Sequence, residues 1–273
     1  MPLERLATYE EMFRRGPVGR YAVGERFLIW CTQPTLCGLV LWGQPTVADM
    51  QRLAHVFDRG EGSGIAVPCD YVLDARRLDR VDGSVFADMV AVSTPRMTEI
   101  VRRVRRQALV LGPAALPSAV VSGFYALVGA RMQWRLVDDL AAALAWCEAP
   151  DPAAIAAELE GLVVEVLAGT AEVDRLRAWL RDGGLHATLD EAARALGVSA
   201  RSLQRRLGAG GSSFRAELEQ ARLAAAQRLL LDTDHKVAAI AAEVGASSES
   251  NFIAFFRRLT GHTPAAWRAA RRE

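Results

Sequence analysis

The chain has few of the residues on which disulfide frameworks and metal sites depend. It contains four cysteines in 273 residues, and no two of them form a C-x-x-C pair. The four histidines are scattered and suggest no metal cluster. We therefore expect buried, reduced thiols, with no bound metal or cofactor. The cysteines are Cys31, Cys37, Cys69 and Cys147.

Long apolar runs are also lacking. No stretch reaches the roughly 20 apolar residues of a membrane-spanning helix, and the charged start MPLERLATYEEMFRRG does not read as a signal peptide. These absences predict a cytoplasmic protein with no membrane partner. The composition, 51% hydrophobic and 24% charged, is typical of a folded chain, and the length suits two domains.

Lysine is nearly missing, since Lys236 is the single one among 33 basic residues. Because this bias is typical of a GC-rich genome, the abundance of arginine says little by itself about nucleic-acid binding. The distribution of charge says more. Residues 171–273 hold 16 basic and 12 acidic residues, whereas residues 1–170 hold 17 and 20. The C-terminal part is the more basic one, as expected of a DNA-binding half.

Apolar runs and amphipathic stretches alternate through the first 150 residues. This alternation predicts an α/β domain in which helices cover a mostly parallel sheet. A short Gln-Pro-Thr link between the first two runs predicts a hairpin. We expect strands at 26–32, 36–42, 66–74, 107–111 and 132–137, and helices at 3–15, 47–59, 84–105 with a break near Pro95, 117–128, and 139–147 capped by Asp138.

This order resembles that of the STAS and SpoIIAA-like domains over residues 20–148. Those domains open with a hairpin and close with a D-x-x-x-A-L-x-W helix, matched here by the stretch from Asp138 to Trp146. The resemblance implies a mixed sheet with helices and a sensory or interaction role for residues 1–150, with a small-molecule or protein effector. Ser84, in Val-Asp-Gly-Ser, is similar to the phosphorylated serine of that family, although a simple helix cap explains it as well.

A proline-containing stretch at 149–152 ends this domain, and we expect a linker helix within 151–170. Ile155, Leu159, Leu162 and Val166 lie on one face of that helix. Such a seam fits packing onto a neighbouring domain, and it equally fits a homodimer.

An internal repeat at an offset of 48 residues follows within 171–273. Leu189, Ala192, Ala193, Leu196 and Gly197 of the first copy match Val237, Ile240, Ala241, Val244 and Gly245 of the second. In the first copy Thr188 and Glu191 form a capping box, Gly197 occupies the turn, and Ser199 caps the next helix. These are the parts of a helix-turn-helix, so the repeat predicts an all-α domain with two such units joined by a helix at 214–231.

The residues from about Val173 to Arg272 resemble the DNA-binding domain of AraC-type transcription regulators. The signature runs from Ser199-x-x-x-Leu203-x-Arg205-x-Leu207 through Arg222-x-x-x-Ala226 to Phe252-x-x-x-Phe256 and Gly261-x-x-Pro264-x-x-Trp267-Arg268. The resemblance implies a sequence-specific transcription regulator that binds double-stranded promoter DNA.

The same resemblance implies recognition helices at 200–207 and 248–256. The DNA-binding residues it implies are Arg201, Ser202, Gln204, Arg205 and Arg206 in the first helix, and Glu249, Ser250 and Asn251 in the second. Two departures concern the second unit. Ile253 and Ala254 stand where the family usually has a polar residue and an arginine, and Ala246 replaces an aromatic residue. We therefore expect the second helix either mainly to contact phosphate or to be occluded.

An enzyme is the competing interpretation, and its motifs are lacking. The chain has no H-E-x-x-H, no G-x-S-x-G and no P-loop, so we expect no catalytic residue. Asp74, Asp79 and Asp82 suggest a carboxylate site, but solvated loop aspartates are commoner. The alternative that stays open is an α/β domain with its own enzymatic or phospho-switch activity, tethered to DNA. Trp30, Trp42 and Trp134 could line an apolar pocket, but their places in predicted strands favour the core.

Overall fold

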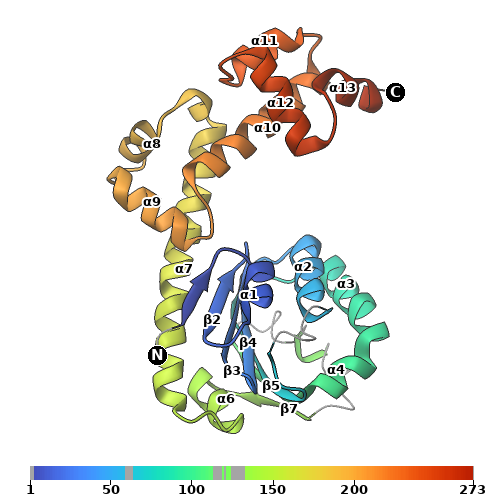
Figure 1. Cartoon of the computed structure of the whole chain (residues 1–273), viewed down its shortest axis with the longest axis vertical. Helices are drawn as coiled ribbons and strands as arrows, with labels where there is room; N and C mark the ends of the chain where they lie inside the picture. Colours follow the sequence, from blue (N-terminus) through green and yellow to red (C-terminus); the bar gives the residue numbers. More distant parts are fainter. Residues whose placement is uncertain (1–2, 59–63, 113–118, 120, 124–132, 273) are drawn as a thin grey trace. The chain divides into compact units, whose positions relative to one another are not determined.

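A computed structural model of the chain describes residues 3–58, 64–112, 119, 121–123 and 133–272 (Figure 1). The chain divides into two compact units, residues 1–164 and 165–273. Helix α7 (Pro152–Arg181) contributes to both. The predicted combination of an α/β part and a helical C-terminal part is confirmed.

A mixed β-sheet forms the centre of the first unit. Within the described residues it has seven strands in the order of the chain, β1 to β7. Strand β2 pairs antiparallel with β3 and β3 with β4, whereas the other neighbours are parallel. The strands are β1 (Glu4–Leu6), β2 (Arg20–Val23), β3 (Phe27–Gln33), β4 (Leu36–Gly43), β5 (Cys69–Leu78), β6 (Val104–Leu111) and β7 (Gln133–Val137).

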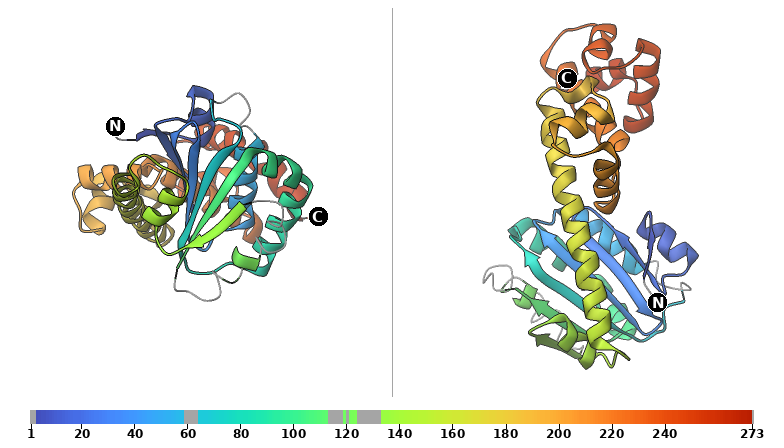
Figure 2. Two further views of the ribbon diagram at one scale, coloured as in Figure 1. Left: turned by 90° about the horizontal axis from the view of Figure 1, so that it is seen from below. Right: turned by 90° about the vertical axis from the view of Figure 1, so that its left-hand side faces the viewer.

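Helices cover both faces of this sheet (Figure 2). The central strands are apolar on both sides, as expected when neither face meets water. Phe27 and Ile29 face one layer of helices, and Leu28 and Trp30 point to the opposite side. The first layer contains α1 (Tyr9–Arg15), α2 (Val47–Asp58), α3 (Gly83–Ser93) and α4 (Met97–Arg103), and the second contains α6 (Leu140–Trp146) and the first part of α7.

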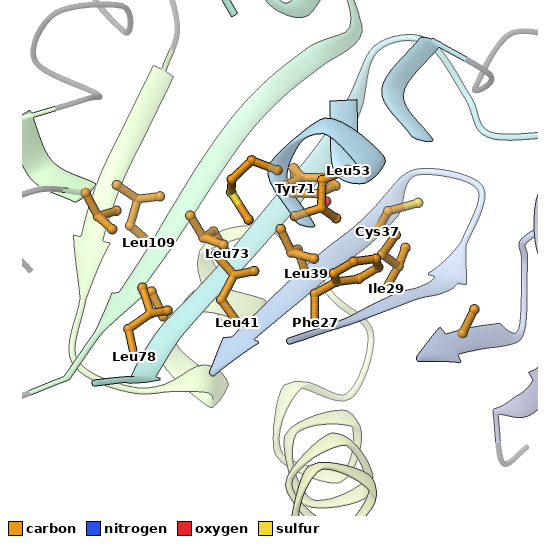
Figure 3. Packing of buried hydrophobic residues seen from close by; sticks show 14 of the residues in the cluster. Phe27, Ile29, Cys37, Leu39, Leu41, Leu53, Tyr71, Leu73, Leu78 and Leu109 are labelled. Carbon is orange, nitrogen blue, oxygen red and sulfur yellow. The ribbon is translucent and has the colours of Figure 1, made fainter. Parts of the chain in front are cut away.

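The main core lies between the first layer of helices and the sheet (Figure 3). Leu39, Leu41 and Leu73 project from neighbouring strands toward Leu53 of α2. Trp30 and Trp42 are buried, as predicted, and Trp134 is half-buried against the same core.

Several elements differ from their predicted bounds. The first helix begins at Tyr9 rather than residue 3, because Glu4–Leu6 pairs with β2 as an edge strand. Strand β2 was not expected. The last short helix is capped by Asp139 rather than Asp138, since the Asp139 carboxylate accepts the Ala142 N–H at 2.7 Å. Most of the helix predicted at 117–128 lies outside the described residues.

The second unit is entirely helical within its described residues. Its helices after α7 are α8 (Leu189–Ala195), α9 (Ala200–Ala209), α10 (Phe214–Asp232), α11 (Val237–Glu243), α12 (Glu249–Thr260) and α13 (Pro264–Arg272), with short 3-10 turns such as η2 (Gly184–His186). Two apolar clusters form its core. One joins the end of α7 to α8 and α9, and the other joins α10 to α11, α12 and α13. The repeat and its connecting helix are confirmed.

Candidate nucleic-acid interface

The first helix-turn-helix consists of α8, a glycine turn and α9. Thr188 and Glu191 form the predicted capping box, and hydrogen bonds from Thr188 lower the pKa of the Glu191 carboxyl. Gly197 adopts a φ of 72°, the left-handed conformation that glycine takes at least cost. Ser199 then caps α9 by accepting the Ser202 N–H at 3.2 Å. The local sequence therefore fixes both ends of the turn.

Helix α9 separates an apolar face from a polar one. Leu203 and Leu207 are fully buried in the first cluster. Arg201, Gln204 and Arg205 are exposed, and within the described part of the chain no hydrogen bond or ion pair holds their side chains. Three long polar side chains are thus available on one face of α9 for an external ligand.

Arg206 lies on a different side of α9 and has a partner in the protein. Its Nη1 donates to Oε2 of Glu172 at 2.8 Å, and the Glu172 side chain is 3% exposed. Arg175 donates to the other carboxylate oxygen at 3.1 Å and also to the Leu196 carbonyl at 2.8 Å. The buried carboxylate therefore joins α7 to both helices of the first helix-turn-helix.

Close backbone contact also connects α7 with the turn after α9. A Cβ atom at Gly169 would lie 2.3 Å from the amide nitrogen of Gly210 and 2.6 Å from the carbonyl oxygen of Arg206. Side chains larger than hydrogen do not fit there. The second half of α7 is thus part of the first helix-turn-helix rather than a spacer before it.

The second helix-turn-helix repeats this construction with one residue more in its turn. Gly245 takes the left-handed conformation at φ 78°, but the helix cap is Ser248, which accepts the Asn251 N–H at 3.1 Å. The offset between copies therefore grows from 48 at the turn to 49 in the second helix. Phe252 and Phe256 take the buried positions of Leu203 and Leu207.

The corrected register changes which residues are equivalent. Position 201 corresponds to Ser250, position 204 to Ile253 and position 205 to Ala254. The exposed start of α12 carries Glu249, Ser250 and Asn251, as predicted, and the Asn251 amide donates to the Ser247 hydroxyl at 2.9 Å. No long polar side chain stands on α12 where α9 has its arginines.

Direct contacts fix one helix-turn-helix against the other. Arg222 of α10 donates to the Leu185 carbonyl at 2.9 Å, and His186 lies 3.1 Å from the Glu243 carbonyl. Arg258 of α12 pairs with Glu219 of α10 at 2.9 Å, which lowers the pKa of that carboxyl. These links set the separation of the two exposed helices.

Lys236, the single lysine, stands at the N-cap of α11. It is exposed, and its side chain makes no capping hydrogen bond. Capping from the side chain, which serine provides for α9, α10 and α12, is therefore missing at α11.

The acidic groups considered in the first unit do not converge. Asp74 is buried and paired with Arg76 at 2.6 Å, and Asp82 pairs with Arg80 at 2.6 Å. Among the described residues, no three His, Cys, Asp or Glu side chains come together as a metal site. Ser84 is exposed in the first turn of α3, whose N-cap is Asp82, so the helix cap predicted at Ser84 is wrong. Of the helices described, none has the length and apolar character required to span a bilayer.

Comparison with known proteins agrees with this geometry. Residues 192–270 match the family of helix-turn-helix domains. The chain is 41% identical over 81 residues to the transcriptional activator NphR of Rhodococcus sp, an alignment covering 30% of this chain and 24% of NphR. The chain thus spans about a quarter of the curated relative that it matches.

Two solved structures contain segments similar to part of this chain. The C-terminal domain of AraT from Geobacillus stearothermophilus is 30% identical, with 37% of this chain and 85% of that one covered and a TM-score of 0.34. The DNA-binding domain of AdpA, solved with a target DNA, is 31% identical, with 37% and 92% covered and a TM-score of 0.34. Residues 192–270 of this chain therefore contain a helix-turn-helix domain.

Proposed function

We propose that the chain is a sequence-specific DNA-binding transcription regulator of the AraC type. The observation that carries this proposal is the pair of helix-turn-helix units, each with the start of its second helix exposed, held to one another through α10. The match to a transcriptional activator over the same residues supports it.

We assign base reading to α9. Arg201, Gln204 and Arg205 are exposed on one face, and arginine and glutamine are the side chains that bond bidentately to guanine and adenine edges in the major groove. Ser202 is half-buried beside the cap and contacts the backbone of DNA in this assignment. Arg206 acts through Glu172, as a positioning residue.

We assign phosphate contact to α12. Ser250 and Asn251 are short donors at the start of the helix, and Glu249 beside them repels the DNA backbone unless it meets a base. The 19 residues of α10 span about 28 Å at 1.5 Å per residue. That length approaches the ~34 Å between successive major-groove faces, so both helices reach one side of a duplex.

The first unit is proposed to receive a small-molecule or protein effector, and its STAS-like character remains part of this proposal. A homodimer also stays a prediction. Leu159 of the apolar seam is fully buried, and Ile155 is half-buried. Burial of Leu159 favours packing within the chain as the role of that seam.

The test uses the full chain and a random-duplex library. Repeated selection is expected to enrich one motif with two half-sites about one helical turn apart, and affinity for it should fall steeply with salt because phosphate contacts release counterions. Arg201→Ala with Arg205→Ala should abolish the enrichment. Arg14→Ala removes an exposed charge from the first unit and is the matched control. Enrichment of no motif, or of the same motif by the double variant, would contradict the proposal.

A further inference from the structure

Two thiols meet in the first unit at a place that the DNA-binding role does not use. Cys31, near the end of β3, is the cross-strand neighbour of Cys37 in β4. Their sulfur atoms lie 2.8 Å apart, with the Cys37 thiol donating to Cys31 and the Cys31 thiol donating to the Gln33 carbonyl at 3.1 Å. Both cysteines belong to the buried cluster that contains Ile29 and Leu39, and Figure 3 shows Cys37 beside these residues.

An apolar cavity opens over this pair. It has a volume of about 70 Å³, several times the roughly 10–15 Å³ that one water needs. Its lining is mainly hydrocarbon and sulfur and comes from α1, α4, the segment before β5 and strands β3 to β6, with Arg103 as the charged residue among them. Residues that line it include Met12, Phe13, Ile65, Val67, Cys69 and Tyr71.

Two of the thiols in this cavity, those of Cys37 and Cys69, are neutral at physiological pH. The hydrogen bond to Cys31, together with burial, raises the pKa of Cys37 well above its usual range. Burial raises the pKa of Cys69 to about 11. Thiolate chemistry such as exchange with a charged disulfide is therefore slow here, and the apolar lining excludes ionic reagents. A ligand that suits the site is uncharged, carries an apolar group and reacts with two thiols together.

We propose that Cys31 and Cys37 form a dithiol site for a trivalent arsenical that carries an apolar substituent. Two As–S bonds form, the As=O bond breaks, and the two thiol protons leave with the oxygen as one water, so neither an oxidant nor a reductant is needed. Two thiols satisfy an arsenic that carries one small alkyl group, which a cavity of about 70 Å³ can hold, whereas inorganic arsenite has three valences to fill. The described residues offer no set of three ligating groups. The site thus prefers the organic form over the inorganic one.

The experiment titrates the full chain with methylarsine oxide in a phosphine reductant and measures intact mass under native conditions. We expect one adduct, heavier than the protein by methylarsine oxide less one water, and its release by ethanedithiol. Arsenite should bind at least tenfold more weakly. If arsenite bound as tightly as the organic arsenical, the proposal that the apolar cavity selects the organic form would be wrong.

Variants and protection mapping locate the site. Cys31→Ala and Cys37→Ala should each weaken binding of the arsenical at least tenfold. Two control variants, Cys69→Ala and Cys147→Ala, should bind it as the wild type does; Cys147 is the buried C-cap residue of α6. Alkylation of the liganded wild-type protein in denaturant should spare Cys31 and Cys37 alone, which tests the assignment without a variant. Binding that survives loss of both cysteines, or protection of a different pair, would refute it.

Discussion

The two helix-turn-helix units differ in the side chains that their second helices expose. The register of the caps places Ser250 and Ala254 at the positions held by Arg201 and Arg205 in the first unit. The two helices therefore contact DNA with different side chains, although their backbones are alike. Helix α9 presents the long guanidinium groups of Arg201 and Arg205, whereas α12 presents short or apolar groups.

We predict that Arg201→Ala or Arg205→Ala weakens binding to the selected site by about 1–3 kcal/mol. The difference in binding free energy between that site and random DNA should shrink as well. The reason is loss of a bidentate base contact, which discriminates at one base pair. Ser250→Ala with Asn251→Ala should cost less discrimination. Anisotropy titrations against every single-base variant of the site measure both. Greater stringency in the half-site of α12 would reverse the assignment.

Arg206 is predicted to behave differently from its neighbours. Arg206→Ala removes one of two arginines from the buried Glu172, so we expect the second unit to lose about 1 kcal/mol of unfolding free energy, a modest value because the guanidinium is partly exposed. Binding should weaken alike for all DNA sequences. Urea unfolding combined with the same titration matrix tests this, with Arg201→Ala as the comparison. If the variant instead lost discrimination at one base pair only, Arg206 would contact a base directly.

At the scale of elements, α7 belongs to two environments. Gly161 has open space where a Cβ would lie, whereas Gly169 is against the backbone of the turn after α9. The two glycines stand eight residues apart in one helix, so helix propensity affects both equally and the surroundings decide the difference.

We predict opposite effects of alanine at these positions. Gly161→Ala should raise the unfolding free energy by up to about 1 kcal/mol through helix propensity. Gly169→Ala should lower it by about 1–3 kcal/mol, since the methyl group overlaps backbone atoms that have no room to move. Thermal unfolding of the two full-length variants gives the comparison. Stabilisation by both substitutions would show that α7 does not approach Gly210 so closely.

The sequence predicted elements with strong periodicity and missed those that depend on distant partners. Thr188, Gly197 and Ser199 act locally, so their roles were readable from the chain. Strand β1 has three residues and exists through its pairing with β2, which no local pattern reveals. The extra residue before Ser248 was hidden because Ser247 is also serine, and the two hydroxyls are equally good caps in a sequence.

Contacts across long sequence separations were also beyond prediction. Glu172 and Arg206 are 34 residues apart, and nothing in either segment marks the carboxylate as buried. A signal was nevertheless present, since Glu172 sits beside Val173 on the helix that carries Leu176 and Leu180 into the core. The exposed face of α9 needed no such partner, and its three long polar residues were predicted from spacing alone.

At the scale of the whole molecule, the position where the DNA-binding unit begins is testable. Val173, Leu176 and Leu180 of α7 belong to the first apolar cluster, and Gly169 contacts the turn after α9. The sequence placed the start of this domain at residue 171, within α7. The packing suggests a start near residue 165.

We predict that residues 165–273 fold and bind the selected DNA with an affinity within about threefold of the full chain. A fragment of residues 182–273 should fail, because three buried core residues are removed with α7. Circular dichroism and anisotropy on both fragments test this. Equal binding by the shorter fragment would mean that α7 is dispensable, and failure of the longer one would mean that the first unit takes part in binding.

The exposed Lys236 at the start of α11 has a practical consequence. Because arginine supplies the other 32 Lys and Arg residues, amine-directed reagents meet one lysine in the entire sequence, besides an α-amino group. An activated ester would attach a fluorophore at a known position beside the second helix-turn-helix without any change to the sequence. Acylation would also remove a positive charge from a helix start, where the helix dipole opposes it. Every lysine-attached label in the natural chain therefore lies at this one position, which suits binding studies once label on the α-amino group is accounted for.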